Sequence, residues 1–445
     1  MRLVLLSGGS GKRLWPLSND SRSKQYLKLF GKGNKMSMLQ RMCAQLKETG
    51  LLENAVIVSS RGQLEILQNQ LGSKLDIALE PDRRDTFPAA LLAASYLVDR
   101  KGASEDEAVC FLPVDPHASS DYFELIKSLE DVLFNSKAQV ALMGIKPTYN
   151  SAKYGYITKK ENFGSYYKVK DFIEKPSEDN ASLLIQNGAM WNSGVFCCKI
   201  SFLTDFLKKY ELPVSYEKLC EQYDRLPKIS LDYKILESGP NMVAADYDGD
   251  WKDLGTWNTL TEEMSSNSIG KVIMDKSKNT SVINETDLPC IVLGAENMIV
   301  VASPDGFLVA EKHQSSFVKK YVENVNARPM YEERRWGTIK IIDISENTLT
   351  RKIKLYSGMN SSFHHHVKHK EIWTILDGKG EMVLGDKKMT VKMGDVIQVP
   401  ENTDHALRAI EDMEFIEVQV GKNIEDDTTR TTLDWNKIME SYNYF

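Results

Sequence analysis

Residues 1–30, MRLVLLSGGSGKRLWPLSNDSRSKQYLKLF, begin with an apolar run and continue at once into a loop with glycine at positions 8, 9 and 11. An apolar strand leading into such a loop is typical of a phosphate-binding edge of an α/β sheet, because glycine lets backbone N–H groups approach a ligand closely. The loop is not a Walker motif, since Arg13 follows Lys12, and Leu14 replaces the third glycine of the dinucleotide fingerprint. A tight turn beside two solvated cations, Arg13 and Lys24, is the alternative.

Short apolar runs alternate with longer amphipathic stretches over residues 1–265. The predicted strands are RLVLLS, NAVIVSS, AVCFLPVD and AQVALMGI, and the predicted helices are MLQRMCAQLKET, FPAALLAASYLVDR and YFELIKSLEDVLF. This alternation predicts an α/β domain with a parallel sheet that carries helices on both faces. Ligands of such sheets bind at the carboxyl ends of the strands, which is where the glycine loop and Asp115 fall.

Two further segments follow this domain. Residues 266–330 contain closely spaced β-rich pieces such as PCIVLGAENMIVVAS, and they are predicted to form a β-rich linker segment for which a β-helix is one arrangement. Residues 331–445 consist mostly of short strands with glycine turns, for example IWTILDGKGEMVLGD. That rhythm predicts a small β-barrel or sandwich.

The overall composition fits a globular protein of two or three domains. The chain has 445 residues, of which 42% are hydrophobic and 27% charged, and its formal net charge is -6. No block of Lys and Arg predicts nucleic-acid binding, and no apolar run approaches the ~18 residues of a membrane span. The six cysteines form no C-x-x-C pair, and the first residues lead directly into a strand, without the layout of a signal peptide. We expect a cytoplasmic protein without a disulfide framework.

The segment GGSGKRLWPLSNDSRSKQYLKL (8–29) resembles the signature GGxGTRLWPLSRxxxPKQFLxL of sugar-nucleotide pyrophosphorylases, in particular mannose-1-phosphate guanylyltransferases. Seven more segments follow in that family's order: EPDRRDTFPAA (80–90), LPVDPHA (112–118), YGYI (154–157), FIEKP (172–176), WNSGVF (191–196), SLDYKILE (230–237) and WKDLGTW (251–257). The departures from the family pattern are Lys12, Ser23, Arg83, Asp85, Phe87 and Pro116. The resemblance implies a Rossmann-like, glycosyltransferase-A-like nucleotidyltransferase domain.

The resemblance also implies a reaction and its catalytic groups. Mannose 1-phosphate would attack the α-phosphorus of GTP, which gives GDP-mannose and pyrophosphate without a protein nucleophile. Arg13 and Lys24 match the cations that stabilise charge on the phosphates. Asp115 and Asp253 match the family's metal ligands, and their hard carboxylate oxygens suit Mg²⁺. A helix N-cap is the alternative role for an aspartate after a strand.

The remaining motifs divide between the two substrates. Two sets of residues resemble the nucleotide-binding part of the family: Gly8, Gly9 and Gly11 in the loop, and Arg84, Asp85 and Thr86 in the second segment. Gly155, Glu174, Lys175 and Asn192 resemble the part that binds the sugar and its phosphate. The tryptophans in these motifs are expected to pack in the core rather than to stack on the base.

Histidines are concentrated near the C-terminus. Four of the seven lie in FHHHVKHKE (363–371), and His405 follows GDVIQVPENTD. His364 and His366 are two residues apart, so in a strand they would point the same way, whereas His365 would point to the opposite face. A solvated polar loop is the alternative. The role of His369 stays open.

The spacing of Gly358, His364, His366, Glu371 and Gly378 resembles the first cupin motif, G-(x)5-H-x-H-(x)4-E-(x)6-G. The segment GDVIQVPENTDH resembles the second motif, with Asn402 in place of Gly. The resemblance implies a cupin β-barrel over residues 331–445. It also implies a site for Zn²⁺, Mn²⁺, Fe²⁺ or Ni²⁺, held by His364, His366, Glu371 and His405.

A cupin after a guanylyltransferase resembles the bifunctional bacterial enzymes that also isomerise mannose 6-phosphate. Two residues depart from that pattern: His364 replaces Gln, and Ala406 replaces the Arg after the metal-binding His. Isomerase activity therefore stays open, with a role in shaping a homo-oligomer as the alternative. For the first domain the alternatives are another base or another hexose 1-phosphate, or a sensor without activity. The retained Arg13, Lys24, Asp115 and Asp253 argue against the sensor.

Overall fold

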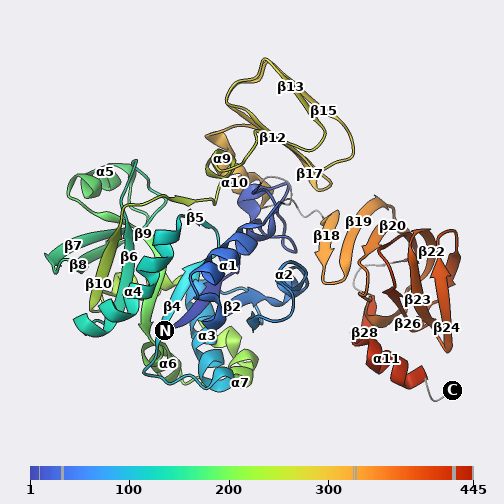
Figure 1. Cartoon of the computed structure of the whole chain (residues 1–445), viewed down its shortest axis with the longest axis horizontal. Coiled ribbons are helices and arrows are strands. Elements are labelled where there is room, and N and C mark those ends of the chain that lie inside the picture. Colours follow the sequence, from blue (N-terminus) through green and yellow to red (C-terminus); the bar gives the residue numbers. More distant parts are fainter. Residues whose placement is uncertain (10, 32–34, 324, 326–327, 423–426, 443–445) are drawn as a thin grey trace.

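A computed structural model describes the chain except for residues 10, 32–34, 324, 326–327, 423–426 and 443–445. Figure 1 shows three parts: a large α/β domain (blue to green), a smaller set of strands above it (yellow) and a β-rich domain (orange to red) that ends at the C-terminus.

A nine-stranded sheet forms the first domain. Its strands, in spatial order, are β3 (Asp76–Glu80), β2 (Ala55–Ser60), β1 (Arg2–Leu6), β4 (Ala108–Pro113), β9 (Met190–Lys199), β6 (Val140–Ile145), β10 (Met242–Tyr247), β8 (Tyr167–Ile173) and β7 (Tyr156–Asn162). The four strands predicted from the sequence are confirmed as β1, β2, β4 and β6. The sequence predicted a parallel sheet, but the sheet is mixed, because β9 runs antiparallel between β4 and β6 and β7–β8 is an antiparallel pair. Local hydrophobic patterns identify strands but do not fix the direction of a distant neighbour.

Helices cover both faces of this sheet. They are α1 (Met38–Glu48), α2 (Leu64–Leu71), α3 (Thr86–Lys101), α4 (Ser120–Ser136), α5 (Glu178–Gln186), α6 (Ile200–Lys209), α7 (Tyr216–Glu221) and α8 (Leu231–Lys234), whereas α9 (Trp257–Glu262) packs with the linker. The three predicted helices are confirmed as α1, α3 and α4. Side chains alternate along β1, so Val4 packs with α3 and α6 on one face, while Leu3 and Leu5 pack with α1 and α4 on the other.

Short 3₁₀ turns complete the domain and its connections. They are η1 (Lys12–Leu14), η2 (Lys24–Tyr26), η3 (Leu52–Asn54), η4 (Arg61–Gln63), η5 (Tyr223–Arg225), η6 (Leu236–Ser238) and η7 (Gln314–Phe317). A small ladder of β5 (Pro116–Ala118) and β11 (Trp251–Asp253) lies beside the main sheet. Both η1 and η2 belong to the glycine-loop segment.

The linker consists of parallel ladders and one antiparallel strand, the last of the linker, at the edge. Its strands are β12 (Ser268–Ile269), β13 (Val272–Asp275), β14 (Ser281–Asn284), β15 (Cys290–Leu293), β16 (Met298–Ser303) and β17 (Gly306–Glu311), and α10 (Val318–Val322) follows. β12, β14 and β16 pair in parallel, as do β13 and β15, which is the arrangement of a short β-helix. Its core is shared with the glycine-loop segment, because Leu14, Leu17 and Leu27 pack with Ile299 and Val301.

The C-terminal domain is a barrel of two facing antiparallel sheets. One contains β18 (Tyr331–Arg334), β19 (Gly337–Ile344), β20 (Thr348–Leu355), β27 (Met413–Gly421), β22 (His369–Asp377) and β25 (Val396–Val399). The other contains β24 (Lys387–Lys392), β23 (Lys379–Leu384), β26 (His405–Ala409), β21 (Phe363–His366) and β28 (Thr428–Thr432). Helix α11 (Trp435–Tyr442) packs on the second sheet through Trp435 and Ile438.

A buried guanidinium joins the three parts. Arg22, from the glycine-loop segment, donates from Nη1 and Nη2 to Glu285 of the linker at 2.7 and 3.0 Å. Its Nε lies 3.5 Å from Glu333 on β18, and the guanidinium stacks on Tyr331. A second connection runs through Asp305, which accepts hydrogen bonds from Asn19 Nδ2 and Met330 N at 2.7 and 2.6 Å.

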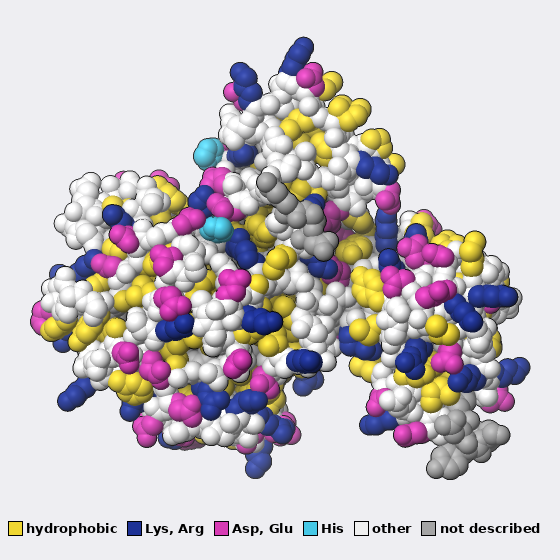
Figure 2. Space-filling model, in the orientation of Figure 1, with side chains coloured by type: hydrophobic (Ala, Val, Ile, Leu, Met, Phe, Trp, Pro, Cys, Tyr) yellow, Lys and Arg dark blue, Asp and Glu magenta, His cyan; other side chains and the backbone are white. Residues whose placement is uncertain are grey.

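The visible surface carries mixed charge. Figure 2 shows Lys and Arg interspersed with Asp and Glu over the displayed face, without a continuous basic stripe there. Exposed apolar side chains gather on the linker strands, among them Ile273, Ile291, Leu293, Phe307 and Val309. Within the described part of the chain, every helix is too short or too polar to span a bilayer.

Candidate functional site

Two adjoining cavities lie at the carboxyl edge of the main sheet. The larger cavity, of about 1000 Å³, is lined by these predicted residues: Gly8, Gly9, Gly11, Arg13, Lys24, Asp85, Thr86, Asp115 and Asn192. The smaller cavity, of about 210 Å³, is lined by Asp115, Gly155, Glu174, Asn192 and Asp253. The two cavities share Asp115 and Asn192, together with Pro113, Gly194 and Asp232.

The glycine loop owes its shape to positive backbone angles and close packing. Gly9 and Gly11 have φ of 106° and 63°, and a Cβ on Gly11 would lie 2.6 Å from the backbone nitrogen of Lys24. Side chains hold the loop from behind: Ser23 Oγ donates to the Gly9 carbonyl at 2.7 Å, and Gln63 Nε2 donates to the same carbonyl at 3.1 Å. The backbone is thus fixed close to the cavity, where only glycine fits.

Antiparallel pairing of β5 and β11 brings the two predicted metal ligands together. The register places Asp253 opposite Pro116, next to Asp115. Lys24 Nζ forms an ion pair with Asp115 Oδ2, and Gly255 N donates to Asp253 Oδ1 at 2.9 Å. Burial lowers the pKa of Lys24, but Asp115 and Asp253 together raise it above its ordinary value.

In this site the ionised form of Asp253 is unfavourable unless a cation lies nearby. Burial, and then the charge of Asp115, raise the pKa of Asp253, although Lys24 opposes this. Two partly buried carboxylates that lie close together are a donor set suited to a hard divalent cation. The residues therefore fit Mg²⁺.

The smaller cavity is built around a hydrogen-bonded carboxylate. Asn192 Nδ2 donates to Asp232 Oδ1 at 2.8 Å, and Asn192 N donates to the Gly155 carbonyl at 2.7 Å. Burial, and then Glu174, raise the pKa of Asp232 to about 6. A Cβ on Gly155 would lie 2.5 Å from Glu174 Oε2, so the glycine keeps this wall open. The cavity thus presents carboxylate and amide groups of the kind that bind hydroxyls.

Two predicted residues do not line either cavity. The guanidinium of Arg84 donates instead to the Leu226 carbonyl at 3.0 Å and pairs with Asp82. Lys175 forms an ion pair with Glu174 and lies over the ring of Tyr233. Competing local partners direct both cations away from the cavities, and the motif spacing cannot show those partners.

Other cations occupy the positions that these two were expected to fill. Arg83 lines the larger cavity and donates at 2.7 Å to Oδ1 of Asp20, which also lines it. Lys153 lines the smaller cavity. The linker contributes Lys319, on α10, to the larger cavity. The sequence alone does not indicate that a linker residue lines this cavity, because the contact depends on how the linker packs against the first domain.

A buried carboxylate at the end of β3 was not identified from the sequence. Glu80 lines the larger cavity and is 4% exposed, and its Oε1 accepts a hydrogen bond from Tyr223 at 2.8 Å. Its Oε2 lies 3.3 Å from where a Cβ on Gly8 would stand. Burial raises the pKa of Glu80 to about 7. The rule that drew attention to Asp115, a polar residue at a strand's carboxyl end, could have found it.

The barrel contains a second cluster of candidate ligands. The Nδ1 atoms of His364, His366 and His405 lie 2.8, 3.2 and 2.9 Å from the carbonyl oxygens of Ser362, Asp427 and Thr403. An Nδ1–H that donates to a carbonyl leaves the lone pair on Nε2, which is the ligand form of imidazole. The three residues can bring one ligand atom each to within 4.8 Å of one another.

Glu371 completes the cluster. Its carboxylate oxygens lie 3.2 Å from His366 Nε2 and 3.3 Å from His405 Nε2, but these buried nitrogens have no hydrogen bond in the part that the structure describes. Trp373 Nε1 and Gln419 Nε2 each donate to the carboxylate at 2.9 Å. Burial raises the pKa of Glu371, but the imidazoles hold it well below its ordinary value. Unpartnered buried imidazole nitrogens beside a fixed carboxylate fit a transition metal.

The two other histidines of the motif differ in environment. His365 Nδ1 lies 3.0 Å from Asp404 Oδ1, outside the cluster. His369 is buried, with Nδ1 3.1 Å from Asp427 Oδ2 and Nε2 3.5 Å from Glu371 Oε1. His369, Glu371 and His366 form a second possible ligand group.

We expect His405→Ala to abolish transition-metal binding by the full chain, because Nε2 of this buried residue faces the other ligands. Metal content after growth with Zn²⁺, Mn²⁺, Fe²⁺ and Ni²⁺, measured by mass spectrometry, checks this. His365→Ala is the matched control and should retain the metal. Wild-type protein that holds none of these metals would reject the site.

Comparisons with known proteins identify two families along the chain. The profile of the nucleotidyl transferase family matches residues 2–268, and that of the cupin domain matches residues 353–419. Mannose-1-phosphate guanylyltransferase RfbM of Salmonella typhimurium is 31% identical over 96% of both chains. Mannose-1-phosphate guanylyltransferase 2 of Escherichia coli O157:H7 is 28% identical over 96% of both chains.

A solved structure shares the fold of most of the chain. The crystal structure described as a mannose-1-phosphate geranyltransferase from Thermus thermophilus is 27% identical, with a TM-score of 0.62, and it covers 73% of this chain and 99% of its own. The chain belongs to the nucleotidyl transferase family and carries a C-terminal cupin domain.

Proposed function

We propose that this enzyme transfers the guanylyl group of GTP to mannose 1-phosphate and forms GDP-mannose and pyrophosphate. The observation that carries the proposal is the border shared by the two cavities, at Asp115 and Asn192. A nucleotide in the larger cavity and a sugar phosphate in the smaller one would meet there, beside Lys24. The names of the full-length relatives support the same substrates.

Glu80 supports guanine as the base. Guanine presents N1–H and N2–H donors side by side, and a carboxylate is the acceptor that matches them. Oε1 of Glu80 is engaged by Tyr223, whereas Oε2 is on the side of Gly8, at the wall of the larger cavity. Adenine, with an acceptor at N1, would leave this buried oxygen without a partner.

The glycine loop and its cations would bind the triphosphate. Backbone N–H groups of the loop, together with Arg13 and Lys24, would neutralise the charge on the phosphate oxygens. Glu174, Asn192 and Asp232 would bind the hexose hydroxyls in the smaller cavity. We assign the sugar phosphate to Lys153, because Lys175 is paired with Glu174.

The reaction needs positioning rather than a protein nucleophile. A phosphate oxygen of mannose 1-phosphate forms a bond to the α-phosphorus, and the bond from that phosphorus to the bridging oxygen breaks, which releases pyrophosphate. Asp115 and Asp253 would hold Mg²⁺, which neutralises phosphate charge when bound. Lys24, fixed by Asp115, would keep a positive charge beside the transferring group.

A second activity, interconversion of mannose 6-phosphate and fructose 6-phosphate, is our proposal for the barrel. A cavity of about 100 Å³ next to the imidazoles favours this activity. Arg334, Arg351 and Arg430 also line the cavity. Ala406, where the bifunctional enzymes have Arg, packs with Val383 and Trp435 beneath α11. This substitution therefore removes no cation from the cavity.

The remaining assignments are also proposals. The enzyme would work in the cytoplasm on GTP and sugar phosphates, and the apolar linker strands are the surface we assign to homo-oligomer formation. Transfer to another hexose 1-phosphate or from another base is the enzymatic alternative. A sensor without activity is the other alternative, and the ion pair of Lys24 with Asp115 beside Asp253 weighs against it.

A panel of nucleoside triphosphates and hexose 1-phosphates, read by pyrophosphate release, tests the function. We expect the highest kcat/KM with GTP and mannose 1-phosphate. Release that is equal with ATP or UTP would contradict the assignment of the base. No release with any pair would support the sensor.

We expect Glu80→Gln to lower kcat/KM for GTP by roughly 10–100-fold, the effect of losing a hydrogen bond to a charged group. The loss should be smaller with ITP, which lacks the 2-amino group. Because the pKa of Glu80 in the free enzyme is about 7 and the ionised form accepts both donors, kcat/KM for GTP should rise with pH through that value in wild type. A variant that keeps both the preference for GTP over ITP and this pH dependence would contradict the role of Glu80.

We expect Asp253→Asn to lower turnover by about 10²–10³-fold, as for loss of one preorganised electrostatic contact. Without Mg²⁺ its Tm should equal or exceed that of wild type, because ionised Asp253 is buried near Asp115. Stabilisation by Mg²⁺ should disappear. Asp250→Asn, a change at the exposed residue just before β11, is the control and should behave as wild type. Normal pyrophosphate release by Asp253→Asn would remove this carboxylate from the site.

A further inference from the structure

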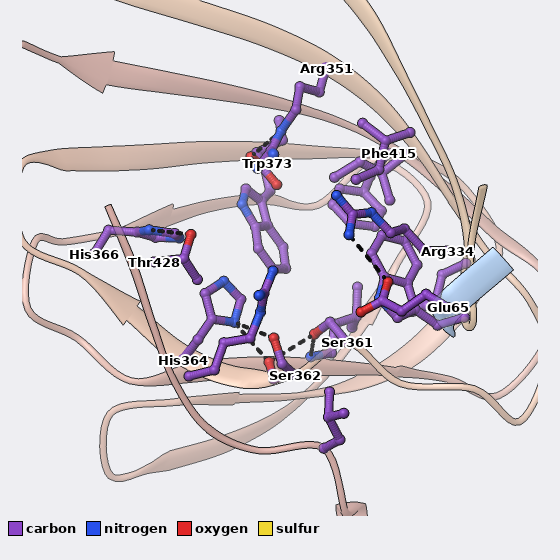
Figure 3. A pocket seen from close by; sticks show the side chains of 18 residues that line it. Glu65, Arg334, Arg351, Ser361, Ser362, His364, His366, Trp373, Phe415 and Thr428 are labelled. Carbon is purple, nitrogen blue, oxygen red and sulfur yellow. Dashed lines mark hydrogen bonds and ion pairs between the residues drawn. The ribbon is translucent and has the colours of Figure 1, made fainter. Parts of the chain in front are cut away.

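The cavity of the C-terminal barrel is completed by the first domain. Glu65, on α2, lines it together with barrel residues, and its Oε2 lies 3.4 Å from Arg334 Nη1. Asn69, one turn further along α2, donates from Nδ2 to the Arg334 carbonyl at 2.8 Å. Figure 3 shows Arg334 and Glu65 on one side of the cavity and His364 and His366 on the other. Helix α2 therefore fixes both the backbone and the side chain of Arg334.

The same helix also holds the glycine loop. Gln63, the residue before α2, is fully buried, and it donates to the Gly9 carbonyl and contacts Ser23 Oγ. Between the two contacts, Ile66 and Leu67 anchor α2 in the core. Because the same short helix contacts both Arg334 and the glycine loop, a movement of α2 at Arg334 would also displace the loop.

A second connection runs along β18. Glu333 is next to Arg334 and lies 3.5 Å from the buried guanidinium of Arg22, which precedes Lys24 by two residues. Lys28 Nζ donates to the other oxygen of Glu333 at 3.0 Å. The residue that lines the barrel cavity is thus connected to the candidate catalytic loop from two sides.

The lining of the cavity favours an anionic sugar. Arg351 is neutralised by Glu417, but Arg430 has no ion pair with a carboxylate in the part that the structure describes. Arg334 contacts Glu65 and Glu332, and its buried Nε has no hydrogen-bond partner among the described residues. Guanidinium groups bind phosphate well, and the aromatic walls of the cavity suit a sugar ring.

The wall of the cavity contains an ion pair that a ligand can reach. Arg334 and Glu65 are the partly exposed ion pair of the wall, with side chains 30% and 29% exposed. A phosphate that binds Arg334 would compete with Glu65 for it.

We propose that a phosphorylated sugar in the barrel cavity takes Arg334 from Glu65 and thereby weakens GTP binding at the glycine loop. This inference rests on the proposed use of GTP. The protein would then have two states that differ in one contact. Without the ligand, Arg334 pairs with Glu65 and this ion pair holds α2 in place. With the ligand bound, Arg334 pairs with the ligand and α2 loses this contact. The coupling is reciprocal, so GTP must weaken binding of the sugar phosphate by the same factor.

Calorimetric titration of the metal-loaded full chain tests this inference, with mannose 6-phosphate as the probe. In wild type we expect saturating mannose 6-phosphate to raise the Kd of GTP with Mg²⁺ by about 5-fold or more. Glu65→Gln should show this raised Kd without the sugar phosphate, and mannose 6-phosphate should add no further change. Glu53→Gln, an exposed change in the same domain, should behave as wild type.

Binding of mannose 6-phosphate alone tests the cavity independently of the nucleotide. Arg334→Met should weaken it by about 10-fold or more, as for loss of a charge-assisted contact. Glu65→Gln should strengthen it, because the competing carboxylate is gone. Absent binding of mannose 6-phosphate, an unchanged Kd of GTP when it is bound, or full coupling in Glu65→Gln would each overturn the inference. A chain that binds mannose 6-phosphate but no GTP would overturn the proposed function and the coupling together.

Discussion

The guanidinium of Arg22 is the constraint on which the arrangement of the domains depends. A charge this deeply buried is stable only when carboxylates and hydrogen bonds replace water around it, and removing one partner of such a group typically costs about 3–5 kcal/mol. Glu285 comes from the linker and Glu333 from the barrel. Burial lowers the pKa of Arg22, but these carboxylates raise it above its ordinary range. The charge is therefore satisfied only when all three parts of the chain are in place.

Because of these ion pairs, the position of the candidate catalytic loop depends on the linker and the barrel, which come later in the chain. Leu14, Leu17 and Leu27 pack into the linker, Asn19 and Arg22 pair with linker carboxylates, and α2 supports the loop from the other side. The loop is then rigid where Lys24 and the glycines line the larger cavity. Preorganised charge of this kind stabilises a transition state without reorganisation during the reaction. The glycine loop thus depends for its shape on residues nearly three hundred positions away in the sequence.

The sequence predicted features that depend on local patterns or on family motifs. Apolar runs identified β1, β2, β4 and β6, and motif spacing selected Asp115 and Asp253, which the β5–β11 ladder brings together. Features set by distant packing were missed: the direction of β9, the turning of Arg84 toward Leu226, and the entry of Glu65 into the barrel cavity. Each of these depends on a neighbour far along the chain. Glu80 was missed although it ends a strand at the same edge as Asp115.

We infer that guanylyl transfer depends on the glycine loop being held from the linker and the barrel through Arg22. Steady-state pyrophosphate release from GTP and mannose 1-phosphate by Arg22→Met in the full chain tests this dependence, with Arg2→Met, at a partly exposed ion pair, as control. We predict that the KM for GTP rises by about 10-fold or more while circular dichroism stays that of the wild type. Kinetic constants for GTP equal to those of wild type, in a folded Arg22→Met protein, would show that the glycine loop does not depend on Arg22.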